Sequence, residues 1–70
     1  METKEKHWLW IDIYNNFDEQ ELINSYWQDE LEISGDELVN VLNEYGGNYA
    51  VVYRCEGDDD NQFYLFEFNK

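Results

Sequence analysis

Carboxylates are the chemically capable side chains that this 70-residue sequence supplies in quantity. It holds 17 aspartates and glutamates against 4 lysines and arginines, which gives a formal net charge of −13 at pH 7. The segment EGDDD at 56–60 concentrates four of these carboxylates in a predicted turn, and the segment DELE at 29–32 holds three more. Between His7 and Asn69, the only lysine or arginine is Arg54. We therefore expect attraction to basic protein surfaces, and no direct binding to nucleic acid or to anionic membranes.

The residue pattern offers little to catalysis or to metal binding. The segment DDDN at 58–61 resembles a fragment of a calcium loop, but it lacks the glycine at the sixth position, and Glu67 comes too early to be the last ligand. His7 and Cys55 are the only histidine and cysteine, which rules out a Cys/His zinc cage. A catalytic Cys–His pair would need both side chains in one pocket with an orienting group. We expect no catalytic residue, no metal ligand and no cofactor, so the protein should act by binding.

Helix capping explains part of the negative charge. Carboxylates in the first turn of a helix accept hydrogen bonds from free amides and oppose the positive end of the helix dipole. In the helices predicted below, these positions are occupied by Asp18, Glu21, Asp36 and Glu37. The other carboxylates near helix ends or in the EGDDD turn have no such role, and we predict that they contact a partner: Asp29, Glu30, Glu32, Glu44, Asp58, Asp59 and Asp60. The alternatives are that charge at a hairpin tip deters edge aggregation, or that acidity only keeps the domain in solution.

Five elements must position these side chains. The alternating segment HWLWIDIY at 7–14 predicts a strand. Capping boxes and helical spacing of apolar residues predict one helix at about 18–31 and a second from Ser34 to Tyr45, which Gly46 and Gly47 end. The runs at 48–56 and 62–69 are rich in β-branched and aromatic residues and predict a hairpin.

These elements predict one α+β domain that covers residues 1–70, with residues 1–6 frayed. The simplest packing is a small three-stranded antiparallel or mixed sheet with two helices on one face, in the order β-α-α-β-β. The composition is 43% hydrophobic and 19% aromatic, so aromatic side chains can build a core in a chain this short.

The first strand also predicts an aromatic surface. If Leu9 and its alternate neighbours pack under the helices, then Trp8, Trp10 and Tyr14 point to the opposite face. Two helices cover only one face of such a sheet, so these aromatics are candidates for partner contact or for a homodimer interface. The alternative is that the aromatics only cover one another and the sheet edges.

In size, acidity and lack of enzymatic motifs, the sequence resembles the nucleic-acid-mimicking inhibitors of phages and mobile elements, notably the anti-CRISPR and anti-restriction proteins. The resemblance rests on the acids at 18–32, on Asp36, Glu37 and Glu44, and on the EGDDD segment; that group has no diagnostic motif to match. It implies a DNA mimic that blocks the nucleic-acid-binding groove of a bacterial defence complex, such as a CRISPR surveillance complex.

A second class of function needs the same electrostatics. An immunity protein or antitoxin that neutralises a basic toxin enzyme would also present carboxylates to a cationic surface. The sequence has no apolar run long enough for a signal peptide or a transmembrane helix, and its lone cysteine suits a reducing compartment. We therefore expect a cytoplasmic protein.

Overall fold

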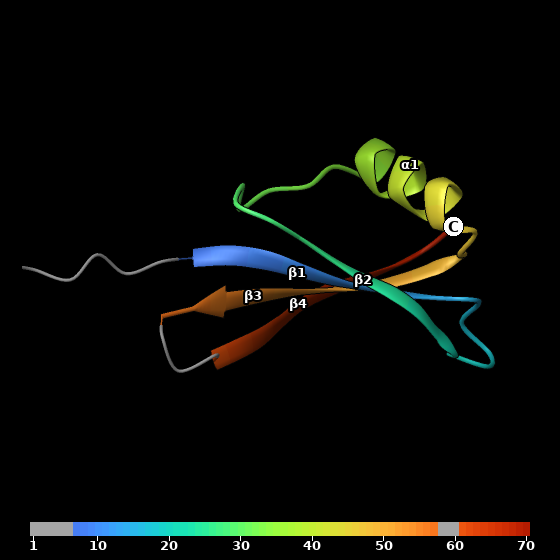
Figure 1. The fold of residues 1–70 in the computed structure, drawn as a ribbon, viewed down its shortest axis with the longest axis horizontal. Helices are drawn as coiled ribbons and strands as arrows, with labels where there is room; N and C mark the ends of the chain where they lie inside the picture. Colours follow the sequence, from blue (N-terminus) through green and yellow to red (C-terminus); the bar gives the residue numbers. More distant parts are fainter. Residues whose placement is uncertain (1–6, 58–60) are drawn as a thin grey trace, which may run out of the picture.

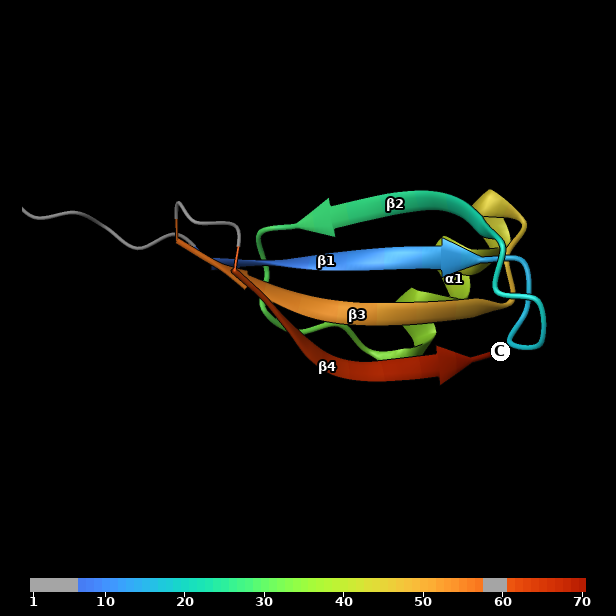
Figure 2. The same cartoon turned by 90° about the horizontal axis from the view of Figure 1, so that it is seen from below.

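The structure is a computed structural model that describes residues 7–57 and 61–70. These residues form a four-stranded antiparallel sheet with one short helix over one of its faces (Figures 1 and 2). The elements are β1 (His7–Tyr14), β2 (Leu22–Gln28), α1 (Gly35–Tyr45), β3 (Tyr49–Glu56) and β4 (Asn61–Asn69). The strand order is β2-β1-β3-β4, so β2 and β4 are the two edges of the sheet.

The predicted three-stranded sheet with two helices is wrong, although the α+β class holds. The prediction failed in one place, at the helix expected over residues 18–31. In the structure, residues 15–21 form a turn and residues 22–28 form β2, which pairs antiparallel with β1. The sheet therefore has one strand more and one helix fewer than predicted.

Two asparagines before the expected helix direct the chain into the turn instead. The Asn15 side-chain oxygen accepts hydrogen bonds from the backbone amides of Asn16 (2.6 Å) and Glu21 (2.9 Å). The Asn16 side-chain oxygen accepts from the amide of Glu19 at 2.7 Å, and Gln20 adopts a left-handed φ of 50°. Asparagine side chains stabilise such turns because they replace backbone acceptors locally. These backbone amides, at the start of the predicted helix, are thus hydrogen-bonded within the turn instead.

Packing against β1 then favours the strand conformation for residues 22–28. The segment LINSYWQ contains asparagine, serine, tyrosine and tryptophan, which are weak helix formers. In the strand, Tyr26 lies opposite Ile11, and Trp27 lies opposite Trp10. Cross-strand pairs between aromatic and β-branched side chains stabilise a sheet, and the isolated sequence pattern does not reveal such partners.

The second predicted helix is confirmed with its caps. Ser34 is the N-cap: its hydroxyl accepts from the Glu37 amide at 3.2 Å, and the Glu37 carboxylate accepts from the Ser34 amide at 2.9 Å. Gly46 ends the helix in the left-handed conformation, with φ at 76°. Leu38 and Leu42 of α1 are buried, and they pack on the sheet.

The core lies between α1 and the two central strands. Its sheet side consists of alternate residues of β1 and β3, namely Leu9, Ile11, Ile13, Ala50 and Val52, all 0–1% exposed. Tyr26 of β2 and Phe68 of β4 pack against the edge of this cluster. The central strands are thus fixed from one side, and their other face is left without a helix.

Candidate binding surfaces

The two faces of the sheet carry different side chains. Leu9, Ile11 and Ile13 face α1, so the alternate residues of β1 point to the opposite, open face. The sequence prediction for Trp8, Trp10 and Tyr14 is confirmed in this respect. Cross-strand partners bring further aromatics to the same face, because paired residues point the same way. The resulting aromatic face consists of Trp8, Trp10, Tyr14, Trp27, Tyr49, Tyr53 and Tyr64.

Carboxylates on the open face are bonded to its aromatic residues. The Asp12 carboxylate accepts from the Trp10 indole nitrogen at 2.8 Å and from the Ser25 hydroxyl at 2.9 Å. The Glu67 carboxylate accepts from the Tyr49 hydroxyl, and this hydrogen bond, aided by burial, raises the pKa of Tyr49 to about 12. These two carboxylates help to order the aromatic face.

One end of the open face is closed by rings. Tyr49 is buried under Tyr14, whose ring centroid lies 5.7 Å away, and under Phe17, whose ring meets it edge-on at 5.3 Å. Burial, with the nearby charge of Asp12, raises the pKa of Tyr14. The other end is open: Trp27 is 56% exposed and lines a hollow with Trp8, Trp10 and Asp29. The aromatic face therefore has a packed half and an accessible half.

A second surface is the connection from β2 into α1. We call residues 29–37 the acidic loop, since five of its residues are acidic: Asp29, Glu30, Glu32, Asp36 and Glu37. The Gln28 side-chain amide donates to the backbone oxygens of Glu30 and Glu32, both at 3.0 Å, and so holds the loop against the end of β2. These two bonds give an irregular segment a defined shape.

The acidic loop lines an open hollow of about 740 Å³. Its lining residues are Glu30, Leu31, Glu32, Ile33, Ser34 and Glu37. Leu31 is 39% exposed, so apolar surface is accessible between the carboxylates. A side chain that combines an apolar stem with a positive end would satisfy both parts of this hollow.

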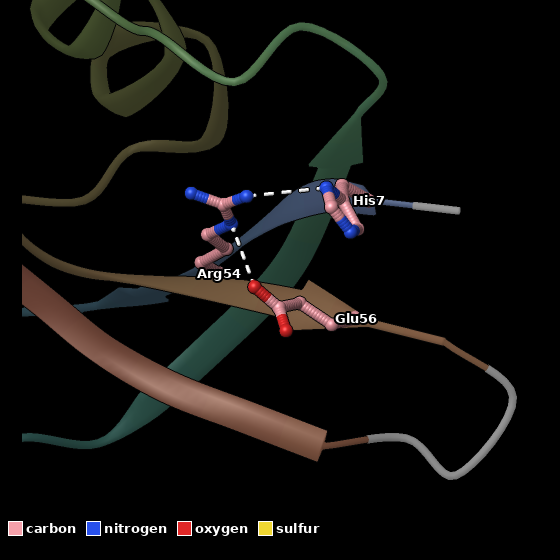
Figure 3. A network of polar contacts seen from close by, with 3 residues as sticks. All are labelled: His7, Arg54 and Glu56. Carbon is pink, nitrogen blue, oxygen red and sulfur yellow. Dashed lines mark hydrogen bonds and ion pairs between the residues drawn. The ribbon is translucent and has the colours of Figure 1, made fainter. Parts of the chain in front are cut away.

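The lysine and the arginine among the described residues, Lys70 and Arg54, contact groups outside the acidic loop. The Nε atom of Arg54 lies 3.1 Å from the Glu56 carboxylate, and its guanidinium is 3.1 Å from Nδ1 of His7 (Figure 3). The Lys70 ammonium donates to the side-chain oxygen of Asn43. Both bases thus have partners outside the acidic loop.

The predicted partner-binding carboxylates are brought together only in part. Asp29, Glu30 and Glu32 lie together in the acidic loop, whereas Glu44 is in the last turn of α1, at the far end of the helix. Asp58, Asp59 and Asp60 lie outside the described residues. The end of β2, the end of β3 and the start of β4 share one end of the sheet (Figure 2), so the described residues that flank 58–60 lie at the same end as Asp29, where the acidic loop starts.

Sequence reasoning missed the part played by Trp27. The helix predicted at about 18–31 would include Trp27 among its regularly spaced apolar residues, yet Trp27 is an exposed residue of an edge strand. The segment LINSYWQ has no alternation of apolar and polar residues, so the only strand signal was its content of residues that favour strands, namely Ile23, Tyr26 and Trp27. With β2 in place, Trp27 joins Trp8 and Trp10, two of the residues that the sequence did single out.

His7 and Cys55 do not form a pair. His7 lies opposite Glu56 in the β1–β3 register and points to the helix-covered face. Cys55 lies opposite Trp8 and points to the open face, where it is buried. Within residues 7–57 and 61–70, no group of three or more histidine, cysteine, aspartate or glutamate side chains is arranged to hold a metal ion. In the same ranges, no helix has the length and apolar character needed to cross a membrane.

The comparisons with known proteins give no relative of this chain. No protein-family model matches the sequence, and neither the curated proteins nor the solved structures contain a significant match. The function must therefore be argued from the surfaces themselves.

Proposed function

We propose that this protein is an acidic inhibitory binding protein that occupies a basic, nucleic-acid-binding groove of another protein. The observation that carries the proposal is the acidic loop, where carboxylates and apolar side chains line one open hollow. The sequence resemblance suggests the class of target: a bacterial defence complex of the CRISPR or restriction type. The protein would act as a DNA mimic that blocks its target stoichiometrically.

The hollow of the acidic loop suits the side chains that line such grooves. Lysine and arginine carry a long apolar stem with a charge at its end. Leu31 and Ile33 offer contact to the stem, while Glu30 and Glu32 offer acceptors to the charged end. A groove that binds phosphates presents several such side chains in a row.

The charge density of the loop is of the same order as that of a nucleic acid strand. The six residues that precede the helix, 29–34, span at most about 20 Å when fully extended, and three of them are acidic: Asp29, Glu30 and Glu32. A single DNA strand carries one phosphate per ~3.4 Å of helix axis, so it presents about six charges over the same length. This part of the loop therefore supplies at least about half of that charge density.

Such contacts are available at the same end of the sheet. Trp8, Trp10 and Trp27 lie on the open face beside the start of the acidic loop. Tryptophan and tyrosine dominate the binding energy of many interfaces, whereas exposed charges mainly set the rate and the orientation of association. We expect the carboxylates to orient the partner and the aromatic rings to slow its release.

Competition with nucleic acid tests the proposal. A tagged copy should capture a nucleic-acid-binding protein from a lysate of its native host, and excess duplex DNA should release the captured protein. Raising the salt concentration should weaken capture steeply, because exposed charges are screened. A captured protein that stays bound in excess DNA would contradict the proposal and would favour neutralisation of a toxin away from its substrate groove.

A further inference from the structure

The accessible half of the open face contains a small hollow whose rings the proposed function uses only as contact surface. It has a volume of about 290 Å³ and is lined by Trp8, Trp10, Trp27 and Asp29. Trp8 and Trp10 come from β1, while Trp27 and Asp29 come from the end of β2 and from the residue that follows it. Three indole rings and one carboxylate thus converge from two neighbouring strands.

The sheet holds these rings in position. Trp10 and Trp27 are direct cross-strand partners, and Trp8 follows Trp10 on the same face. The Trp10 indole donates to Asp12 at 2.8 Å, and Ser25 of β2 donates to the same carboxylate oxygen at 2.9 Å. One acceptor therefore fixes the Trp10 ring and links it to the strand that carries Trp27, so the hollow is largely formed before any ligand arrives.

The lining selects a positively charged organic group. The face of an indole ring is electronegative and attracts cations, most strongly among the aromatic side chains. Asp29 adds a full negative charge at the same hollow. A neutral apolar occupant would cover the Asp29 carboxylate without pairing it, and that is unfavourable.

We propose that this hollow is a binding site for an organic cation, namely a guanidinium or alkylammonium group on an apolar stem. Its natural source is an arginine or lysine side chain of a partner protein. The proposed function uses the same three tryptophans as partner contacts, but the assignment does not require a nucleic-acid-binding groove, because it rests only on these rings and Asp29. The site would stand even if excess DNA failed to release a captured partner. A second copy of this chain is a poor occupant, since the net charge of −13 repels it.

Nuclear magnetic resonance of the indole N–H groups tests the site directly. The full chain, labelled with ¹⁵N, is titrated with arginine and with lysine, each blocked at both termini, and with tetramethylammonium. Blocked citrulline, which has nearly the shape of arginine but no charge, is the matched neutral probe. We expect the cations to shift the resonances of Trp8, Trp10 and Trp27 saturably, and citrulline to shift them at least about fivefold less at equal concentration.

Variants assign the binding to the hollow. Trp27→Ala should weaken cation binding by about tenfold or more, and Asp29→Asn by about threefold to tenfold. Tyr64→Ala is the matched aromatic control, because Tyr64 is 58% exposed on the same face but belongs to β4, and Trp27 is 56% exposed. Glu30→Gln is the matched charge control, since Glu30 lines the hollow of the acidic loop instead. Both controls should bind within about twofold of the parent protein.

Three results would overturn the assignment. Equal shifts with citrulline and arginine would show that charge is not recognised. Undiminished cation binding in both Trp27→Ala and the conservative Trp27→Phe variant would place the cation elsewhere. Tryptophan shifts that depend on protein concentration without any added cation would show that a second copy fills the hollow.

Discussion

The two faces of the sheet differ in what their side chains do. On the face under α1, Ile11, Ile13 and Val52 are fully buried and meet the apolar side of the helix. On the open face, the equivalent positions carry tryptophan and tyrosine, and several of their rings are half-exposed. The covered face carries most of the core, whereas the exposed rings of the open face, such as Trp27, can be changed with smaller consequences for stability.

The open face is itself divided into a packed half and an accessible half. Around Tyr49 it is packed by neighbouring rings, as a core would be. Around Trp27 it is hollowed.

Truncation of the covered face should be the most damaging change. Leu42→Ala removes a side chain that is 0% exposed between α1 and the sheet, and we expect it to lower the free energy of unfolding by about 2–5 kcal/mol. Asn40→Ala, an exposed position of the same helix, is the control and should change stability by less than about 0.5 kcal/mol. Urea unfolding followed by circular dichroism measures both. Similar losses in the two variants would mean that α1 does not contribute its apolar side to the core.

The packed half of the open face should contribute a pH-dependent part of the stability. The hydrogen bond to Glu67 raises the pKa of Tyr49 to about 12 in the folded protein, whereas an unfolded tyrosine has a pKa of about 10. Below pH ~10 both states hold this proton and the contribution is complete; as the pH rises from about 10 towards 12, the unfolded state loses its proton first and the contribution disappears.

Tyr49→Phe should therefore cost about 1–2 kcal/mol at neutral pH and flatten the decline in stability above pH ~10. Glu67→Gln should move the pKa of Tyr49 back towards its ordinary value, as followed by the ultraviolet absorbance of tyrosinate. If the parent protein and Tyr49→Phe lost stability in parallel between these pH values, the hydroxyl would not be coupled to Glu67 as the structure shows.

The hollowed half of the open face should matter least for stability. Trp27 is exposed on an edge strand, so Trp27→Ala should cost only about 0.5–1 kcal/mol, the size of one cross-strand pair. Thermal unfolding of this variant beside Leu42→Ala gives the comparison in one experiment. A loss as large as that of Leu42→Ala would show that both faces act as core, and the open face would then be a poor candidate for binding.

Sequence reasoning succeeded where local signals were complete. The capping box of Ser34 and Glu37 and the glycine at 46 define α1 within the segment itself, and the alternation in residues 7–14 defines β1. It failed where the decision depended on distant partners. Residues 22–28 fit a helix by spacing, but Ile11 and Trp10 of the neighbouring strand stabilise them as β2.

The close packing at Gly47 could not be predicted from the sequence either. A Cβ atom there would lie 2.7 Å from the Ile13 side chain and 2.9 Å from the Tyr14 backbone oxygen, so only glycine fits where the chain leaves α1 for β3. The sequence predicted a glycine pair that ends the helix, and Gly46 does so. The second glycine serves a contact with β1 that appears only once the sheet is assembled. Likewise, the alternation in residues 7–14 was enough to select Trp8 and Trp10, but Trp27 joins them only through the pairing of β1 with β2.

We propose that the acidic loop, and not the overall charge, binds a basic partner. A pair of matched charge reversals tests this proposal. Glu30→Lys with Glu32→Lys changes the loop, and Asp18→Lys with Glu21→Lys makes the same change in charge at the turn between β1 and β2, at the other end of the sheet. The measurement is the dissociation constant for the captured partner by calorimetry at physiological salt. We predict a loss of about 100-fold or more for the loop variant and less than about fivefold for the turn variant. Equal losses in the two variants would contradict the claim, because they would show that the partner responds to net charge and not to the loop.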